Sequence, residues 1–226
     1  MANKTFEEKL QFMREHCETG YATDALNLLQ IEYCWVESVQ LQNNDKVTVA
    51  EAFTAQFSLV RDSEMENPVN MYQAVDKCPP AHMLFIAGIH DYQRVGINVM
   101  TRACNRGIAA VVVEGKNRDI KGIQELPMPM YSQGFSPKHP RLSQKFHHET
   151  GVTIHIGGAK INTGDVVIAD GDGVVIIPRE RFDEVFYQME MIAEVEQQAA
   201  EANANKKDMH VDDFLKIIGQ KKNPRK

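Results

Sequence analysis

Arg118 and Asp119 are adjacent residues whose side chains suit chemistry on an anionic substrate. They follow a short apolar run, 111–113, and a glycine at position 115. An arginine guanidinium is a planar fork that can donate two hydrogen bonds to one carboxylate. An aspartate is a hard oxygen ligand, and Mg²⁺ in proteins commonly binds one or two carboxylates and keeps several waters. The pair therefore indicates a site that holds an anionic substrate beside a divalent metal ion.

The pattern around this pair predicts a β-α-β unit. Residues 83–87 and 108–113 are short apolar runs typical of buried strands, and residues 96–106 between them are predicted to form a helix. A unit of this kind is right-handed and places its two strands in parallel in one sheet. Ligands of open α/β sheets bind outside the carboxyl ends of the strands. We therefore expect loops 88–96 and 115–122 to face each other across a crevice.

The other predicted elements complete a single α/β domain over residues 1–226. Amphipathic periodicity and capping signals predict helices at both ends of the chain, and alternating apolar residues with an Asp-Gly turn predict a β layer in the second half. The expected elements are helix 4–17, a helix that starts near Thr23, strand 51–59, helix 69–75, strands 152–156, 165–170 and 173–178, a long helix 181–203 and a short helix 212–219.

Other acidic and histidine-containing segments are interpreted as structural. The segment His147-His148-Glu149 lacks the i, i+4 histidine spacing of a zinc helix, so we expect a surface segment. Asp24 is expected to cap a helix or a turn rather than to act in catalysis. Asp165, Asp170 and Asp172 could form an acidic metal cluster, but their positions at strand ends favour turn carboxylates.

The overall composition excludes several classes of protein. The net charge of −6 argues against a surface built mainly for nucleic acid. No apolar run approaches the ~20 residues that a membrane span needs, and the first 18 residues lack the apolar core of a signal peptide. The cysteines form no C-x-x-C pair or zinc pattern, which is typical of reduced thiols in a cytoplasmic protein. They are Cys17, Cys34, Cys78 and Cys104.

Several separated segments resemble one known family. The segments are 23–26, 102–107, 112–119, 127–134 and 158–175. In this order they resemble the family that joins the regulator of ribonuclease activity A with the 4-hydroxy-4-methyl-2-oxoglutarate aldolases. The resemblance implies a β/β/α swivelling-type domain whose family core covers residues 20–195, followed by a C-terminal helical extension over 196–226. It also implies a homotrimer, or a hexamer of two trimers, with sites at subunit interfaces.

The aldolase branch of this family implies a lyase that depends on Mg²⁺ or Mn²⁺ and releases pyruvate from a 2-oxo acid. The resemblance places Arg118 on the pyruvyl part of the substrate and Asp119 on the metal ion. Substrates of this class include 4-hydroxy-4-methyl-2-oxoglutarate and oxaloacetate, since both can give the same enolate. The loop before the predicted helix is implied to contact the substrate. Its assigned residues are Gly88, Ile89, His90, Asp91, Gly96 and Asn98.

The sequence departs from the family at the start of the predicted helix. The family commonly has Gly-Glu-Leu or Gly-Glu-Met there, and its acid supports metal-bound waters, whereas this chain has Gly96-Ile97-Asn98. Asp91 could compensate, or a neighbouring subunit could supply an acid. The candidates on the long C-terminal helix are Glu184, Glu190, Glu194 and Glu196. The alternative function is therefore a non-catalytic regulator that binds a ribonuclease or another protein, although that branch tends to lose the aspartate that this chain keeps.

Overall fold

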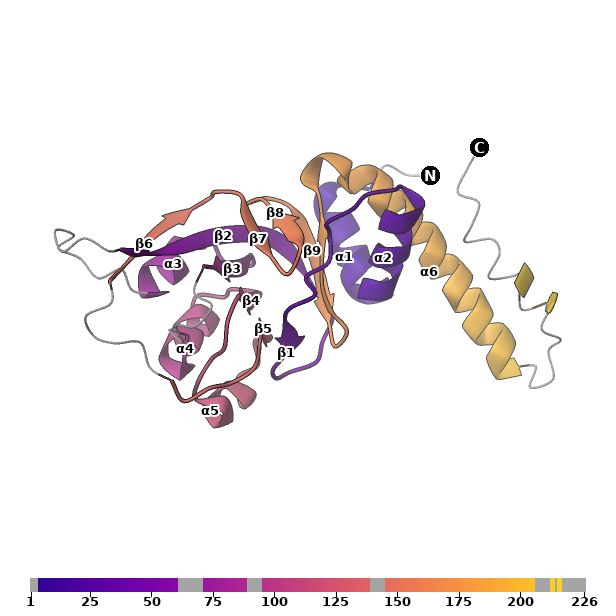
Figure 1. Ribbon diagram of the computed structural model, residues 1–226. Coiled ribbons are helices and arrows are strands. Elements are labelled where there is room, and N and C mark those ends of the chain that lie inside the picture. Colours follow the sequence, from indigo (N-terminus) through magenta and orange to yellow (C-terminus); the bar gives the residue numbers. More distant parts are fainter. Residues whose placement is uncertain are drawn as a thin grey trace.

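The mixed sheet at the centre of the molecule carries helices on one face and at one end (Figure 1). This computed structural model describes residues 4–60, 71–88, 95–138, 145–205, 212–213 and 215–216. The helices are α1 (Phe6–His16), α2 (Thr19–Leu28), α3 (Met71–Lys77), α4 (Ile97–Asn105), α5 (Ile120–Gln124) and α6 (Phe182–Asn205). The strands are β1 (Gln40–Leu41), β2 (Thr48–Val60), β3 (Met83–Ala87), β4 (Ala110–Val113), β5 (Met130–Ser132), β6 (Lys145–Thr150), β7 (Ile154–Ile156), β8 (Ala159–Ile161), β9 (Val166–Asp170) and β10 (Gly173–Ile177).

The predicted β-α-β unit is confirmed. Strand β3 pairs in parallel with β4, and α4 connects them. Both strands are buried on both faces because their side chains alternate between two apolar clusters. Leu84 and Ile86 face the cluster that α3 and α4 cover, whereas Met83 and Phe85 face the cluster that includes β7 and β8. Burial on both faces explains why these strands have continuous apolar sequences.

Strand β2 connects the two halves of the sheet. Its first residues pair antiparallel with β9, its middle residues pair in parallel with β3, and its last residues pair antiparallel with β6. Within the described residues, the main sheet has eight strands in the order β1-β5-β4-β3-β2-β9-β10, with β6 on β2. Figure 1 shows β2 running across the body from β9 towards β6.

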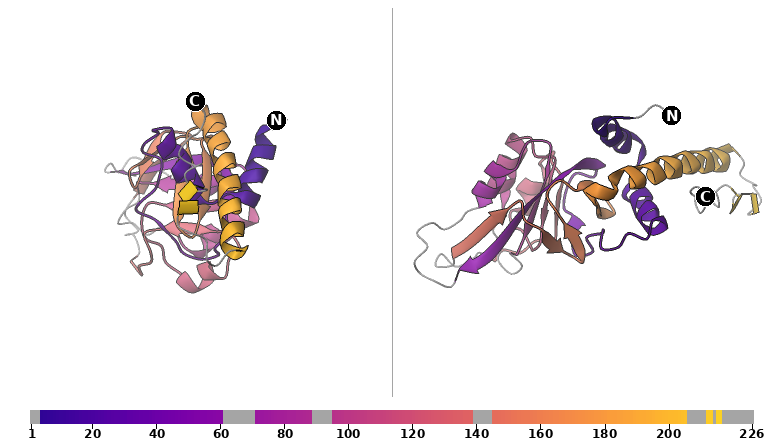
Figure 2. Two further views of the ribbon diagram at one scale, coloured as in Figure 1. Left: turned by 90° about the vertical axis from the view of Figure 1, so that its right-hand side faces the viewer. Right: turned by 90° about the horizontal axis from the view of Figure 1, so that it is seen from above.

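Helices α1, α2 and α6 gather at one end of the molecule, and α6 extends beyond the other two (Figures 1 and 2). They bury one face of β9 and β10, where Val166, Ile168 and Ile177 meet Leu26 and Phe182 in one apolar cluster. The opposite face of the same two strands lies in the cluster shared with β7 and β8. The predicted helices 4–17 and 181–203 and the hairpin between β9 and β10 are confirmed.

The predicted start of the second helix near Thr23 is wrong. Helix α2 begins at Thr19, and the Thr23 hydroxyl donates to the Thr19 carbonyl inside the helix. The cause is a distant residue, because the Asp170 carboxylate accepts hydrogen bonds from the Thr19 amide at 2.8 Å and from its hydroxyl at 2.7 Å. This carboxylate satisfies a donor that the helix itself leaves unpaired, so the helix can start earlier. Asp24 is exposed within α2 and does not cap it.

The turn interpretation of Asp165 and Asp170 is confirmed. Asp165 is buried and accepts the backbone amides of Asn162 and Arg179, at 2.7 and 3.0 Å. Asp170 also accepts the amide of Asp172 at 3.0 Å, within the turn between β9 and β10. The described residues contain no group of three or more histidines, cysteines or acids placed to hold a metal ion.

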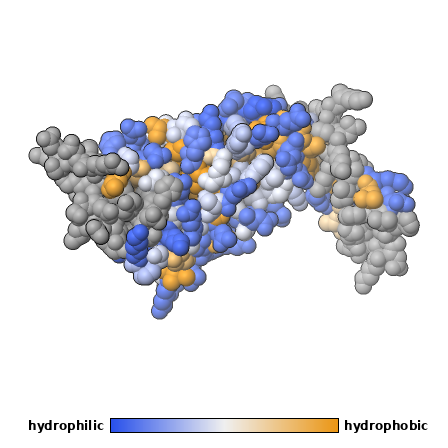
Figure 3. Space-filling model, in the orientation of Figure 1, coloured by the Kyte–Doolittle hydropathy of each residue, from blue (hydrophilic) through white to orange (hydrophobic). Residues whose placement is uncertain are grey.

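The surface of the described residues is mainly polar on the face shown in Figure 3, with smaller hydrophobic areas between. No helix in the described part of the chain has the length and apolar character needed to cross a membrane. All four cysteines are free thiols, as predicted, and burial raises the pKa of Cys34 to about 11.

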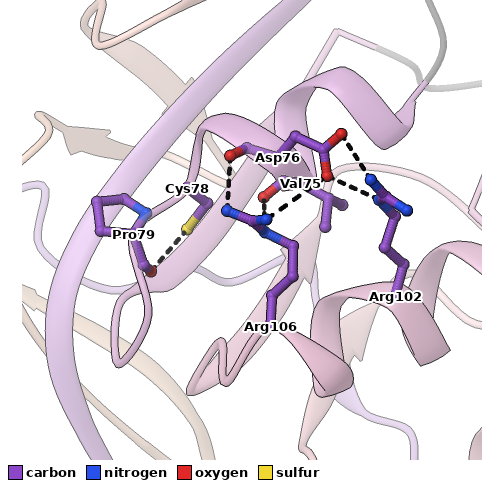
Figure 4. A network of polar contacts seen from close by, with 6 residues as sticks. All are labelled: Val75, Asp76, Cys78, Pro79, Arg102 and Arg106. Carbon is purple, nitrogen blue, oxygen red and sulfur yellow. Dashed lines mark hydrogen bonds and ion pairs between the residues drawn. The ribbon is translucent and has the colours of Figure 1, made fainter.

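Helices α3 and α4 are joined by polar contacts around Asp76 (Figure 4). Arg102 donates from Nε and Nη2 to the two carboxylate oxygens of Asp76, at 2.7 and 2.8 Å. Arg106 donates to the carbonyls of Val75 and Asp76, at 3.1 and 2.7 Å. These carbonyls belong to the last turn of α3, where a cation is favourable. The contacts therefore fix the two helices that cover one face of the β-α-β unit.

We predict that Asp76→Asn makes the protein slightly less stable at neutral pH. The hydrogen bond from Arg102 lowers the pKa of Asp76 below its ordinary value of 3.8, so the ionised pair stabilises the fold above that value. The contribution disappears as the pH falls through the lower pKa of the folded protein. Urea unfolding of the wild type and of Asp76→Asn should show a small difference in the free energy of unfolding at pH 7, since exposed ion pairs contribute little. At a pH below the pKa of Asp76 in the folded protein the two should unfold alike. An equal difference at both pH values would contradict this account.

Candidate functional site

The two loops at the carboxyl ends of β3 and β4 lie beside each other, as the sequence predicts, and their described residues are in direct contact. The crevice expected between them stays a prediction. Three hydrogen bonds connect their described residues. They run from the Gly88 amide to Glu114 Oε2 at 2.8 Å, from the Arg118 amide to the Val95 carbonyl at 3.4 Å, and from the Ile97 amide to Asp119 Oδ2 at 3.0 Å. The parallel pairing of β3 and β4 explains the contact, because it aligns the ends of both strands.

Asp119 is the residue of this region other than glycine that is described with a positive φ. It lies just before α5 in the left-handed region, with φ 68° and ψ 40°, which is uncommon for a residue other than glycine. Its Oδ2 accepts the Ile97 amide and lies 3.8 Å from Arg118 Nε. No donor among the described residues forms a hydrogen bond with the other carboxylate oxygen, Oδ1. The side chains of Arg118 and Asp119 are 43% and 38% exposed, so solvent or a small ligand can reach both.

Gly96 lies against this pair, and a side chain at this position would displace the Asp119 carboxylate. A Cβ atom at position 96 would lie 2.5 Å from Asp119 Oδ2 and 3.4 Å from Arg118 Nε. Gly88 is required for a different reason, because its φ is 80° and a Cβ atom would lie 2.0 Å from the Phe57 carbonyl oxygen. The structure therefore brings Gly96 to the Arg118–Asp119 pair, whereas the Gly88 amide already donates to Glu114.

Asn98 lies on a different side of α4. It lines a hollow of about 440 Å³ with Tyr72, Thr101, Arg102, Asn105 and Arg106, a lining that includes neither Arg118 nor Asp119. The structure does not bring the Asn98 side chain to the Arg118–Asp119 pair in this hollow, and the substrate contact predicted for Asn98 stays a prediction. Ile89, His90 and Asp91, which were also predicted to contact the substrate, lie outside the described residues.

The histidine-containing segment forms strand β6. His147 Nε2 lies 3.6 Å from Glu149, and the His148 ring stacks on Phe57 with a centroid distance of 5.5 Å. Burial lowers the pKa of His148, which favours the neutral ring in this apolar contact. The arrangement agrees with the structural interpretation, although His148 is more buried than a surface segment would be.

Three residues of this region have structural roles that the sequence pattern does not predict. Glu114 fixes the end of β3 through the Gly88 amide, and Ile97 provides the amide that holds Asp119. Asn117 is fully buried beside Arg118, and its Oδ1 has no hydrogen-bond partner among the described residues. The available signal for Glu114 and Asn117 was their place in the same sequence segment as Arg118. Their partners are 26 and 13 residues away in sequence, so spacing alone did not indicate them.

We predict that Asn117→Leu raises the free energy of unfolding by about 1 kcal/mol. A buried polar group without a partner is costly, and an apolar side chain of similar shape removes that cost. The contact of Asn117 Nδ2 with Met130 Sδ at 3.5 Å is the only side-chain hydrogen bond lost among the described residues. Urea unfolding measures the change.

Ser132→Ala is the matched control, since Ser132 is equally buried but its hydroxyl is hydrogen-bonded to the backbone of Gly134. This substitution should lower the free energy of unfolding by about 1 kcal/mol. A clear loss of stability in Asn117→Leu would show that the amide oxygen has a partner.

Comparison with known proteins gives a consistent match. The family model described as RraA-like, Aldolase/RraA, matches residues 20–176. Protein DlpA of Legionella pneumophila is 27% identical over 172 residues, which cover 75% of this chain and 28% of DlpA. The 4-hydroxy-4-methyl-2-oxoglutarate aldolase of Thermus thermophilus is 29% identical over 84 residues, which cover 37% of this chain and 50% of that enzyme. The matched stretch therefore spans half or less of the length of these relatives.

Solved structures with the same fold cover more of the chain. An uncharacterized protein from Pseudomonas syringae superimposes with a TM-score of 0.78 and 22% identity, over 94% of this chain and 98% of that one. Streptomyces coelicolor RraAS2, described as an unusual member of the RNase ES inhibitor RraA protein family, gives a TM-score of 0.73 and 20% identity, over 88% of this chain and 99% of that one. At these identities the structures show the fold alone.

Proposed function

This chain belongs to the RraA-like (Aldolase/RraA) family, and on that premise we propose that it is a divalent-metal-dependent lyase that releases pyruvate from a 2-oxo acid. The family contains both 4-hydroxy-4-methyl-2-oxoglutarate aldolases and ribonuclease inhibitors among the named relatives. The observation that carries the proposal is the position of Arg118 and Asp119. Both lie at the carboxyl end of β4, partly exposed, and against the glycine at position 96.

The residues present fit a water-rich Mg²⁺ or Mn²⁺ site. Asp119 offers one carboxylate whose Oδ1 accepts no hydrogen bond from a described residue, while Oδ2 is held by the Ile97 amide. Mg²⁺ commonly takes one or two carboxylates and several waters, so a single protein carboxylate suffices. The described residues offer no cluster of histidines and cysteines that would favour zinc. When bound, the cation would polarise the carbonyl oxygen at C2 of the substrate.

Arg118 would bind the pyruvyl end of the substrate and stabilise the enolate. Its planar guanidinium can donate two hydrogen bonds to a carboxylate. Negative charge develops on the C2 oxygen when the C3–C4 bond breaks, and a fixed donor beside that oxygen stabilises the transition state. Cleavage of 4-hydroxy-4-methyl-2-oxoglutarate and decarboxylation of oxaloacetate share this enolate, so one arrangement can serve both reactions.

The proposal includes assembly as a homotrimer or a hexamer, with the site completed by a neighbouring subunit. What supports it is the partial exposure of Arg118 and Asp119, because the described residues of one chain leave the pair open on one side. Sedimentation equilibrium of the purified protein measures the number of subunits.

We predict that purified protein releases pyruvate from oxaloacetate in a reaction that needs Mg²⁺ or Mn²⁺. A coupled lactate dehydrogenase assay with and without chelator measures it. Asp119→Asn and Arg118→Lys should each lower kcat by about 10²–10³, the usual cost of losing one fixed electrostatic contact. Lys121→Ala is the control, since this exposed neighbour is also charged but is given no role. Full activity in Asp119→Asn would remove the metal role, and activity unaffected by chelator would exclude the proposed chemistry.

The alternative function is that of a regulator that binds a ribonuclease. What favours it is the apolar Ile97 where the aldolase branch commonly has an acid, together with the fold shared with RraAS2. A purified protein that inhibits a ribonuclease in a cleavage assay, and that shows no metal-stimulated pyruvate release, would support this function over the lyase.

A further inference from the structure

Ile97 makes two contacts that together hold Asp119. Its backbone amide donates to Asp119 Oδ2 at 3.0 Å. Its side chain packs over Gly122 of α5, where an added Cβ atom would lie 2.9 Å from Cγ1 and 3.0 Å from Cδ1 of Ile97. One residue of α4 therefore contacts both the carboxylate of Asp119 and the helix that starts directly after it.

The glycine at position 122 has a packing reason rather than a conformational one. Its φ lies outside the left-handed region, so an alanine could adopt the same backbone conformation. Glycine within a helix is less favourable than alanine because it loses more conformational freedom on folding. The space that Ile97 occupies explains why this position has no side chain.

The left-handed backbone of Asp119 requires support from its surroundings. A strained conformation of a residue other than glycine persists only where neighbouring contacts fix it. At Asp119 these contacts are the amide of Ile97 on Oδ2 and the amide of Ile123 on its carbonyl, at 3.1 Å. The packing of Ile97 over Gly122 holds the first turn of α5, which includes Ile123, against the start of α4. Loss of that packing would release both supports.

We propose that Ile97 is a positioning residue for the metal ligand Asp119. By fixing Oδ2 through its amide and α5 through its side chain, it leaves Oδ1 as the carboxylate oxygen free for the cation. This inference rests on the proposed function, because it assumes that Asp119 binds Mg²⁺ or Mn²⁺. It also gives the apolar residue at position 97 a role in the site that does not depend on an acid there.

The test measures Mn²⁺ binding by electron paramagnetic resonance, which reports free Mn²⁺ and needs no turnover. Ile97→Ala keeps the amide but removes the side chain, and Gly122→Ala adds the Cβ atom that displaces Ile97. Each should weaken Mn²⁺ binding by about 10-fold or more, as is usual for residues that orient a metal ligand. The double variant should bind no more weakly than Ile97→Ala alone, since the small side chain at position 97 leaves room for the added methyl group.

Val99→Ala is the matched control, since it truncates a buried side chain on the same helix that is not among the atoms nearest to the Cβ position of Gly122 and whose amide does not hold Asp119. It should bind Mn²⁺ within about twofold of the wild type, because no metal ligand depends on it. Urea midpoints of all variants establish that each is folded under the binding conditions. Wild-type affinity in Ile97→Ala, or independent losses that multiply in the double variant, would overturn the inference alone. Absence of Mn²⁺ binding by the wild type would overturn the metal-dependent function together with it.

Discussion

The parallel pairing of β3 with β4 is the constraint on which the candidate site depends. It aligns the ends of two strands that are buried on both faces, so the loops that follow them meet at one edge of the sheet. The hydrogen bond between Ile97 and Asp119 then joins the two loops beside the side chains of the candidate site, Arg118 and Asp119. If this pairing shifted by one residue, every side chain of β4 would point to the opposite face of the sheet. Arg118 would then no longer lie beside Gly96 at the start of α4.

The parts of the fold that follow from short sequence patterns could be predicted. The β-α-β unit has two apolar runs around an amphipathic segment, and the β9–β10 hairpin has an Asp-Gly turn between alternating residues. Each of these sequence patterns lies within the element that it predicts or directly beside it. The Arg118–Asp119 pair could be recognised for the same reason, because the two residues are adjacent and follow a strand. Family membership could be inferred because the order of several weak motifs is more specific than any one of them.

The parts that could not be predicted depend on residues distant in sequence. The start of α2 is set by Asp170, which is 151 residues away, so local capping rules indicated the wrong residue. The contact of Ile97 with Gly122 crosses between two helices, and a glycine in a predicted loop gives no sign of what it packs against. The left-handed backbone of Asp119 is likewise a product of its neighbours, because aspartate has no strong preference for that conformation.

The bond between Thr19 and Asp170 also has a consequence for the order in which the chain can fold. Helices α1 and α2 are synthesised well before the elements that bury them, because β9, β10 and α6 come from the last third of the described chain. A short amphipathic helix in water is marginal until its apolar face is covered. During synthesis α1 and α2 must therefore wait, with their apolar side chains uncovered, until β9, β10 and α6 have left the ribosome. Contacts of such long sequence separation slow folding and expose the nascent chain to association with other chains.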